Sequence, residues 1–310
     1  MRKVVVTGAT GMIGISLIKY LLSQNIEILA IIRKNSKRKS ELPNDKKLKV
    51  IEYNLNELKY LDINENDYDV FYHFGWDGTF GDERNDKEKQ LLNIEYTKDA
   101  VYLAKRLGCK TFIGAGSQAE FGRVEGVINK KTHPKPENEY GKAKFQACLE
   151  SRKIANNLKI KHIWSRIFSI YGPYDGENTM VMSSIREMLQ GNSPEYTEGN
   201  QDWDYLYIED AVRALFLIAE NGKNNKVYFI AYGKTRKLYE YIEIIKNNIN
   251  PNIILKLGAK PYAENQVMNL NVDISELEKE CGFKPQYTFE EGILKTIKWY
   301  KNHFIDGEKI

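Results

Sequence analysis

The sequence predicts an α/β fold, in which helices cover both faces of a doubly wound parallel sheet and a smaller C-terminal α/β lobe completes the chain. Two observations lead to this prediction. Strand-like and helix-like runs alternate through the first half of the chain, which is typical of a parallel sheet buried on both faces. From about Tyr171 this alternation gives way to polar turns, which indicates that the chain leaves the sheet.

The strand-like runs are short, apolar and separated by helix-like segments. In chain order they read KVVV, IEILAII, KLKVIEYN, DVFYHFG and TFIGAGS, and helices are expected over residues 13–22, 91–107 and 181–190. A polar turn at 191–201 is followed by DYLYIEDAVRALFLIAEN, which we interpret as a return to the sheet. We therefore expect one domain over residues 1–171 and about 205–230, and a lobe over 172–204 and 231–310.

Composition favours a protein that acts on small molecules. The net charge of +4 is small against 46 basic and 42 acidic residues, so the chain lacks the concentrated basic face that nucleic-acid binding needs. The N-terminal apolar run is too short for a signal peptide, and no run approaches the roughly 18 apolar residues of a membrane span. Three cysteines without zinc-site spacing and four scattered histidines predict reduced thiols, no metal site and a cytoplasmic location.

A glycine-rich loop, TGATGMIG from Thr7, connects the first strand to the first helix. Gly8, Gly11 and Gly14 permit a tight turn, close approach of the backbone to a pyrophosphate, and close packing of helix on strand. The N-terminus of the helix then offers free N–H groups to phosphate. This order of strand, loop and helix predicts a dinucleotide site, whereas the alternative is an ordinary glycine-rich turn.

Basic residues close the second strand, where such a fold contacts the adenosine ribose. An acidic residue there would accept hydrogen bonds from the ribose hydroxyls, but this sequence has Arg33. Further donors for a 2′-phosphate follow it: Lys34, Ser36, Lys37 and Arg38. The pattern favours NADP(H), with NAD(H) still possible. The alternative interpretation is a solvated basic loop without a ligand.

Tyr140 and Lys144 stand four residues apart in ENEYGKAKFQACLE, so a helix would place them on one face. A phenol has a pKa near 10, and acid/base work at neutral pH needs a nearby positive charge, which an ammonium one turn away supplies. Ser117 ends the strand TFIGAGS, and catalytic groups of parallel sheets gather at such strand ends. The three together predict catalysis of proton transfer at a substrate oxygen.

At this point the chain resembles the extended short-chain dehydrogenase/reductases, the NAD-dependent epimerase/dehydratase family. The resemblance rests on six landmarks in order: TGATGMIG, GSQAEFG, YGKAK, RIFSIYGP, WDYLYIEDA and DISELEKECGFKPQYTFEEGILKTIKWY. It implies a Rossmann-type domain, a C-terminal lobe that binds a nucleotide-diphosphate sugar as substrate, and a homodimer formed through the helices that flank the active site.

The resemblance also implies which residues contact the ligands. Cofactor contacts are expected from Gly8, Thr10, Gly11, Met12, Ile13, Gly14, Arg33, Asn54, Leu55, Phe74, Gly75, Tyr140 and Lys144. Substrate contacts are expected from Trp76, Gln118, Ser169, Asn178 and Trp203, although Trp76 would serve equally as a core residue.

Departures from the family's pattern reduce the number of reactions that we expect this chain to catalyse. Members that dehydrate sugars carry adjacent Asp and Glu after the catalytic hydroxyl, whereas this chain has Gln118 and Ala119, so a 4,6-dehydratase is not expected. Glu120, one position later, is expected to point away from the substrate. Ser169 replaces the family's usual Asn and Trp203 its usual Arg, which puts the usual diphosphate contacts in doubt.

The basic loop and these departures look similar to a group of sugar 4-ketoreductases that make products such as CDP-abequose or dTDP-fucose. Our hypothesis is NADPH-dependent reduction of the 4-keto group of a nucleotide-diphospho-4-keto-6-deoxyhexose. Tyr140 would protonate the alkoxide, Lys144 would lower the pKa of that tyrosine and hold the nicotinamide ribose, and Ser117 would orient the carbonyl. The alternatives are an NAD-dependent nucleotide-sugar 4-epimerase and a non-catalytic NADP-binding sensor or docking module.

Overall fold

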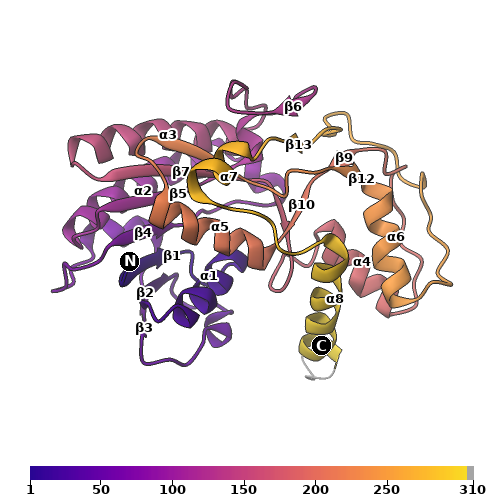
Figure 1. Cartoon of the computed structure of the whole chain (residues 1–310), viewed down its shortest axis with the longest axis horizontal. Helices are drawn as coiled ribbons and strands as arrows, with labels where there is room; N and C mark the ends of the chain where they lie inside the picture. The colour runs from indigo at the N-terminus through magenta and orange to yellow at the C-terminus, as the bar shows by residue number, and fades with distance from the viewer. Residues whose placement is uncertain (306–310) are drawn as a thin grey trace.

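The computed structural model describes residues 1–305 and contains a parallel sheet with helices on both faces, as the sequence predicts (Figure 1). The seven strands lie in the order β11 (Lys226–Ile230), β7 (Lys161–Ile167), β5 (Thr111–Ser117), β4 (Val70–His73), β1 (Lys3–Thr7), β2 (Glu27–Ile32) and β3 (Leu48–Glu52). After β3 the chain crosses to the other side of β1. The strand order therefore reverses between β1 and β4, and ligands of such sheets bind beyond the strand ends at this point.

Alternate residues of the central strands enter two separate cores. Val4 and Val6 pack with the helices α1 (Met12–Ser23) and α5 (Ile208–Asn221), whereas Val5 packs with α2 (Lys87–Arg106) and α3 (Glu139–Asn157). Because successive side chains of a strand point to opposite faces, the uninterrupted apolar run KVVV requires cover on both sides. Each fully buried aliphatic side chain contributes roughly 1.5–3 kcal/mol, so the two helix layers hold the sheet firmly.

The remaining elements build three small sheets and a group of helices beside the main sheet. The pairs are β8 (Ser169–Tyr171) with β10 (Tyr205–Tyr207), β9 (Asp202–Trp203) with β12 (Arg236–Lys237), and β6 (Val127–Ile128) with β13 (Asn271–Val272). The helices are α4 (Met180–Leu189), α6 (Leu238–Ile249), α7 (Ser275–Cys281) and α8 (Phe289–Tyr300). Figure 1 shows α4, α6 and α8 grouped on the side away from β2 and β3.

The expected return to the sheet within DYLYIEDAVRALFLIAEN is wrong in detail. Its strand β10 pairs in parallel with β8, outside the seven-stranded sheet, and the chain rejoins that sheet only at β11. The reason lies in aromatic packing, because the buried ring of Tyr171 in β8 lies 5.8 Å from Tyr205 and 5.6 Å from Tyr207 in β10. The short aromatic strand β10 is thereby held against β8, outside the seven-stranded sheet.

The C-terminal segment crosses between the two groups of elements. Helix α7 packs against α5 and β11, and Lys226 of β11 forms an ion pair with Glu276 at 2.8 Å. Helix α8 instead packs against α6 and β10. Within residues 1–305, no helix combines the length and apolarity that crossing a membrane requires.

Candidate active site

The glycine loop packs so closely that side chains at two of its positions are excluded. Gly8 has a φ of +66°, and a Cβ there would lie 2.6 Å from the amide nitrogen of Gly75. A Cβ on Gly14 would lie 2.4 Å from the carbonyl oxygen of Gly8. No side chain of the described residues caps helix α1, which begins after Gly11. The loop thus leaves uncapped amides at a helix N-terminus beside the switch point, as a bound pyrophosphate requires.

The basic loop after β2 contains one arginine that is free to meet a ligand. Lys34 is ion-paired with Glu57, and Arg38 donates to the carbonyl oxygen of Tyr174 at 2.8 Å. Arg33 is exposed and has no hydrogen-bond or ion-pair partner within residues 1–305. Its position at the end of β2 therefore fits the predicted contact with a ribose or its 2′-phosphate.

The segment after β3, which is expected on the adenine side of the cofactor site, packs closely against the end of β4. The side-chain oxygen of Asn54 accepts from the backbone of Lys34 at 3.1 Å, which joins the loops after β2 and β3. A Cβ on Gly75 would lie 2.6 Å from a methyl group of Leu55. Thr10 accepts a hydrogen bond from Ser36 at 2.9 Å, so the glycine loop and the basic loop are also joined.

The predicted catalytic side chains come together at the end of β5. Asn138 caps helix α3 by accepting from the amide of Gly141 at 2.7 Å, which places Tyr140 in the first turn. Lys144 follows one turn later, buried, and donates to the carbonyl oxygen of Ala115 at 2.7 Å. Its Nζ lies 5.7 Å from the centre of the Tyr140 ring. Ser117 ends β5 and hydrogen-bonds the Tyr140 phenol.

The surroundings shift the pKa values of both Tyr140 and Lys144. Burial raises the pKa of Tyr140, while a hydrogen bond to Ser117 and the charge of Arg84 act to lower it. Burial lowers the pKa of Lys144 to about 7, and the carboxylate of Glu120 acts in the opposite direction. The phenol is therefore protonated at neutral pH and ready to donate, and the amine changes its charge in the same pH range.

Aromatic rings and cations alternate around the phenol. The indole of Trp76 meets Tyr140 edge-on, with ring centres 6.0 Å apart, and the Nζ of Lys144 lies 3.7 Å from the centre of the indole ring. Arg84 lies over the ring of Tyr140, with its guanidinium carbon 4.6 Å from the ring centre. Trp76 therefore belongs to the site. Such cation contacts are worth about 0.5–2 kcal/mol each, depending on exposure.

Arg84 is a site residue that sequence reasoning missed. It belongs to the turn η3 (Gly81–Asn85), which is tied to α2 because the side chain of Gln90 donates to the carbonyl oxygens of Gly78 and Glu83 at 2.7 and 2.9 Å. Gln90 also accepts from the indole of Trp76 at 2.9 Å. No local pattern marks an arginine in this polar turn, so only its packing against Tyr140 identifies it.

Glu120 points into the protein, as expected. Its carboxylate is fully buried and accepts from the Nε of Arg166 at 2.7 Å, from the indole of Trp164 at 2.9 Å and from the backbone of Ser117 at 2.9 Å. The residue between it and Gln118 is Ala119, so this segment offers no carboxylate to a substrate.

Gln118, beside Ser117, and two residues of the segment before and within β9 have buried polar atoms without partners in residues 1–305. The side-chain oxygens of Gln118 and Gln201 and the indole nitrogen of Trp203 are buried without a hydrogen bond within residues 1–305. An unsatisfied buried polar group costs about 1–3 kcal/mol, so these atoms fit a role in contacting a ligand. Sequence reasoning named Gln118 and Trp203 but missed Gln201, which precedes β9 without any distinguishing motif.

The other predicted substrate residues lie outside the seven-stranded sheet. Ser169 lies in β8, and Asn178 is exposed just before α4. Within residues 1–305, neither these two nor Trp203 forms a hydrogen bond or ring contact with Ser117, Tyr140 or Lys144. Their roles stay predictions.

The family model of the NAD dependent epimerase/dehydratase family matches residues 4–231, which include the glycine loop, Ser117, Tyr140 and Lys144. The chain belongs to this family. The family prediction is therefore confirmed, and the seven-stranded sheet confirms the predicted Rossmann-type fold.

Members of the family that resemble this chain include epimerases and dehydratases. A provisionally named UDP-glucose 4-epimerase of Methanocaldococcus jannaschii is 27% identical, with 97% of this chain and 99% of the relative covered. A dTDP-glucose 4,6-dehydratase of Escherichia coli is 31% identical over 51% of this chain and 49% of that enzyme. The structure of a UDP-N-acetylglucosamine 4-epimerase of Methanobrevibacter ruminantium, in complex with UDP-N-acetylmuramic acid, has a TM-score of 0.88 and 25% identity, covering 98% and 99% of the two chains.

Proposed function

We propose that this chain reduces the 4-keto group of a nucleotide-diphospho-4-keto-6-deoxyhexose with NADPH. The observation that carries this proposal is the composition of the site at the end of β5. A phenol, a hydroxyl and an amine meet there, while the one carboxylate of GSQAEFG is turned into the protein. Such a site can move a proton on and off an oxygen, but it lacks the carboxylates that remove a sugar's carbon-bound protons.

In the proposed reaction each side chain has one task. The glycine loop, Arg33 and Lys144 would hold NADPH, which would supply the hydride when bound. Ser117 donates a hydrogen bond to the carbonyl oxygen, and Tyr140 gives its proton to the alkoxide that forms. The raised pKa of Tyr140 suits this donation, because the phenol stays protonated at neutral pH. Gln118 and Trp203 supply the unpaired acceptor and donor that would hold the sugar nucleotide.

The preference for NADPH is tested at Arg33. Arg33→Asp should shift the ratio of kcat/KM for NADPH over NADH toward NADH by at least about tenfold, because a carboxylate repels a 2′-phosphate and accepts from ribose hydroxyls. Lys46→Asp, an exposed change of the same charge elsewhere, should leave the ratio within about twofold. An unchanged ratio in Arg33→Asp would remove the support for NADPH.

We propose that Arg84 lowers the pKa of the Tyr140 phenol. Arg84→Met should move the limb of the pH–rate profile that reports Tyr140 to higher pH, because the variant loses a positive charge over the ring that lowers the phenol's pKa. Arg84→Lys keeps the charge and should move that limb much less. Equal profiles for Arg84→Met and the unmodified enzyme would leave Arg84 a packing role alone.

A second candidate is an NAD-dependent nucleotide-sugar 4-epimerase. The full-length likeness to a UDP-N-acetylglucosamine 4-epimerase favours it. The same three side chains would serve this reaction, with Tyr140 first accepting and then returning the proton. An epimerase must retain its cofactor through the turnover, whereas a reductase exchanges it.

One experiment separates the candidates. The nucleotide released from denatured, purified protein is identified by mass, and NADPH oxidation is then followed with dTDP- and CDP-4-keto-6-deoxyglucose. Little bound cofactor with rapid oxidation supports the reductase. Tightly held NAD, no net oxidation and interconversion of UDP-hexoses support the epimerase. NADP binding without turnover of either substrate class would instead favour the third hypothesis, a non-catalytic sensor or docking module.

We also propose that the chain forms a homodimer through α2 and α3. Large apolar side chains are about half exposed on these helices: Leu91, Leu92 and Tyr102 on α2 and Leu149 on α3. Sedimentation should give a dimer at micromolar concentration and a monomer for Leu92→Glu. A monomer in both cases would contradict the proposal.

The predicted division of the chain also stays a proposal. Residues 1–171 with about 205–230 would bind the dinucleotide, and 172–204 with 231–310 would bind the sugar nucleotide. Hydrogen exchange provides the test, because NADPH should protect the first set and a nucleotide sugar the second. The same protection pattern with both ligands would argue against this division.

A further inference from the structure

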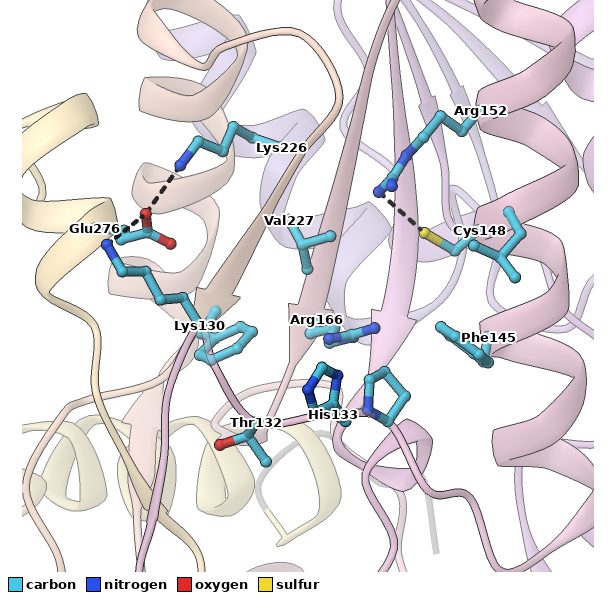
Figure 2. A pocket seen from close by; sticks show the side chains of 13 residues that line it. Lys130, Thr132, His133, Phe145, Cys148, Arg152, Arg166, Lys226, Val227 and Glu276 are labelled. Carbon is cyan, nitrogen blue, oxygen red and sulfur yellow. Dashed lines mark hydrogen bonds and ion pairs between the residues drawn. The ribbon is translucent and has the colours of Figure 1, made fainter.

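A cavity of about 400 Å³ lies beside helix α3 and over β7 and β11. None of Ser117, Tyr140 and Lys144 lines it. Figure 2 shows Arg166 and His133 near its middle, with Phe145 and Cys148 on one side and Glu276 on the other. Four cationic side chains line the cavity, against one carboxylate: Lys130, Arg152, Arg166 and Lys226. The lining is therefore positively charged.

The two lysines share that carboxylate. The Nζ of Lys226 lies 2.8 Å from an oxygen of Glu276, and the Nζ of Lys130 lies 3.6 Å from the same oxygen. Figure 2 draws this group together at one end of the cavity. Glu276 thus offsets part of the charge of the two lysines, and Glu120 pairs with Arg166, so Arg152 is the cation of this lining that has no ion-pair partner within residues 1–305.

Both arginines have unused hydrogen-bond donors. The side chain of Arg166 is 7% exposed, and its Nε donates to Glu120, while its two terminal nitrogens have no hydrogen-bond partner within residues 1–305. Within residues 1–305, Arg152 donates only to the sulfur of Cys148, at 3.6 Å, and its Nε is buried without a partner. Sulfur is a weak acceptor, so this guanidinium is poorly satisfied. Two guanidinium groups with free donors beside one cavity are suited to an anion.

One wall of the cavity is apolar, with Phe145 and Leu149 of α3 and Val227 and Phe229 of β11, and the remaining lining residues are Thr132, His133, Pro134 and Cys148. We propose that the cavity binds a phosphate monoester, with the phosphate on Arg152 and Arg166 and the esterified group against the apolar wall. This assignment is independent of the reaction proposed above.

Arg166 also connects the cavity to the active site. Its Nε holds Glu120, and Glu120 accepts from the backbone of Ser117. A phosphate on the free terminal nitrogens of Arg166 would share this guanidinium with Glu120, so binding in the cavity would affect the strand end that carries Ser117.

The test is calorimetric titration of the full chain with phenyl phosphate and inorganic phosphate at matched ionic strength, with chloride as the reference anion. Phenyl phosphate should bind saturably and more tightly than inorganic phosphate. Arg152→Gln should weaken its binding at least about tenfold, through the loss of a charge-assisted bidentate contact. Arg186→Gln, which removes a partly exposed arginine outside the cavity, should change the Kd by less than about twofold. An equal Kd in Arg152→Gln and the unmodified protein would place the anion elsewhere and overturn the proposal.

A second measurement does not depend on any variant. Crystals of the unmodified protein soaked with tungstate, a phosphate analogue, should show an anomalous peak between the guanidinium groups of Arg152 and Arg166. Tungstate bound only at the glycine loop, or nowhere, overturns the proposal. Both readouts measure binding directly, so a failure of the proposed reductase activity would leave them unaffected.

Discussion

Tyr140→Phe should lower kcat by about 10²–10⁴-fold, because the variant keeps the ring but loses the proton that the phenol donates. The Kd for the cofactor should stay within about twofold, since Lys144 keeps its contacts with Ala115 and Trp76. Steady-state turnover and a separate titration of cofactor binding measure the two quantities.

Tyr72→Phe is a matched control for that result. Tyr72 is fully buried in the sheet domain, and within residues 1–305 its hydroxyl contacts only the sulfur of Met1. This change should leave turnover within about twofold. Near-normal turnover in Tyr140→Phe would move the acid role to another group, and equal losses in both variants would indicate a structural effect.

Glu120→Ala should destabilise the protein by about 3–5 kcal/mol, because removal of one partner leaves a buried charge uncompensated. Arg166 is the uncompensated group, and Trp164 and the backbone of Ser117 lose an acceptor as well. Denaturant unfolding monitored by circular dichroism measures the change in the free energy of unfolding.

Two further variants sharpen this prediction. Glu120→Gln keeps an acceptor for Trp164 and Ser117 but loses the charge, so its free energy of unfolding should lie between those of Glu120→Ala and the unmodified protein. Glu125→Ala, an exposed change nearby, should stay within about 0.5 kcal/mol. If Glu120→Ala were as stable as Glu125→Ala yet inactive, Glu120 would have to act on the substrate.

The two predictions rest on different kinds of feature: the Tyr140 prediction follows from local sequence patterns, and the Glu120 prediction from contacts between distant segments. The spacing of Tyr140 and Lys144, the glycines of the loop and the end of TFIGAGS are local patterns, and backbone geometry converts each of them into a defined position. The alternation of apolar runs likewise determines the parallel sheet, since KVVV needs cover on both faces. These features were accessible from the sequence because each involves neighbours along one element.

The sequence by itself thus determined the fold class, the family and the three side chains that meet at the end of β5. The tertiary structure alone decided what surrounds them: Arg84 on the phenol, Glu120 turned toward Arg166, the pairing of β10 with β8, and the cavity between α3 and β11. The physical reason is that burial, charge pairing and the pKa values that follow depend on contacts between segments distant in the chain, and no local periodicity encodes those contacts.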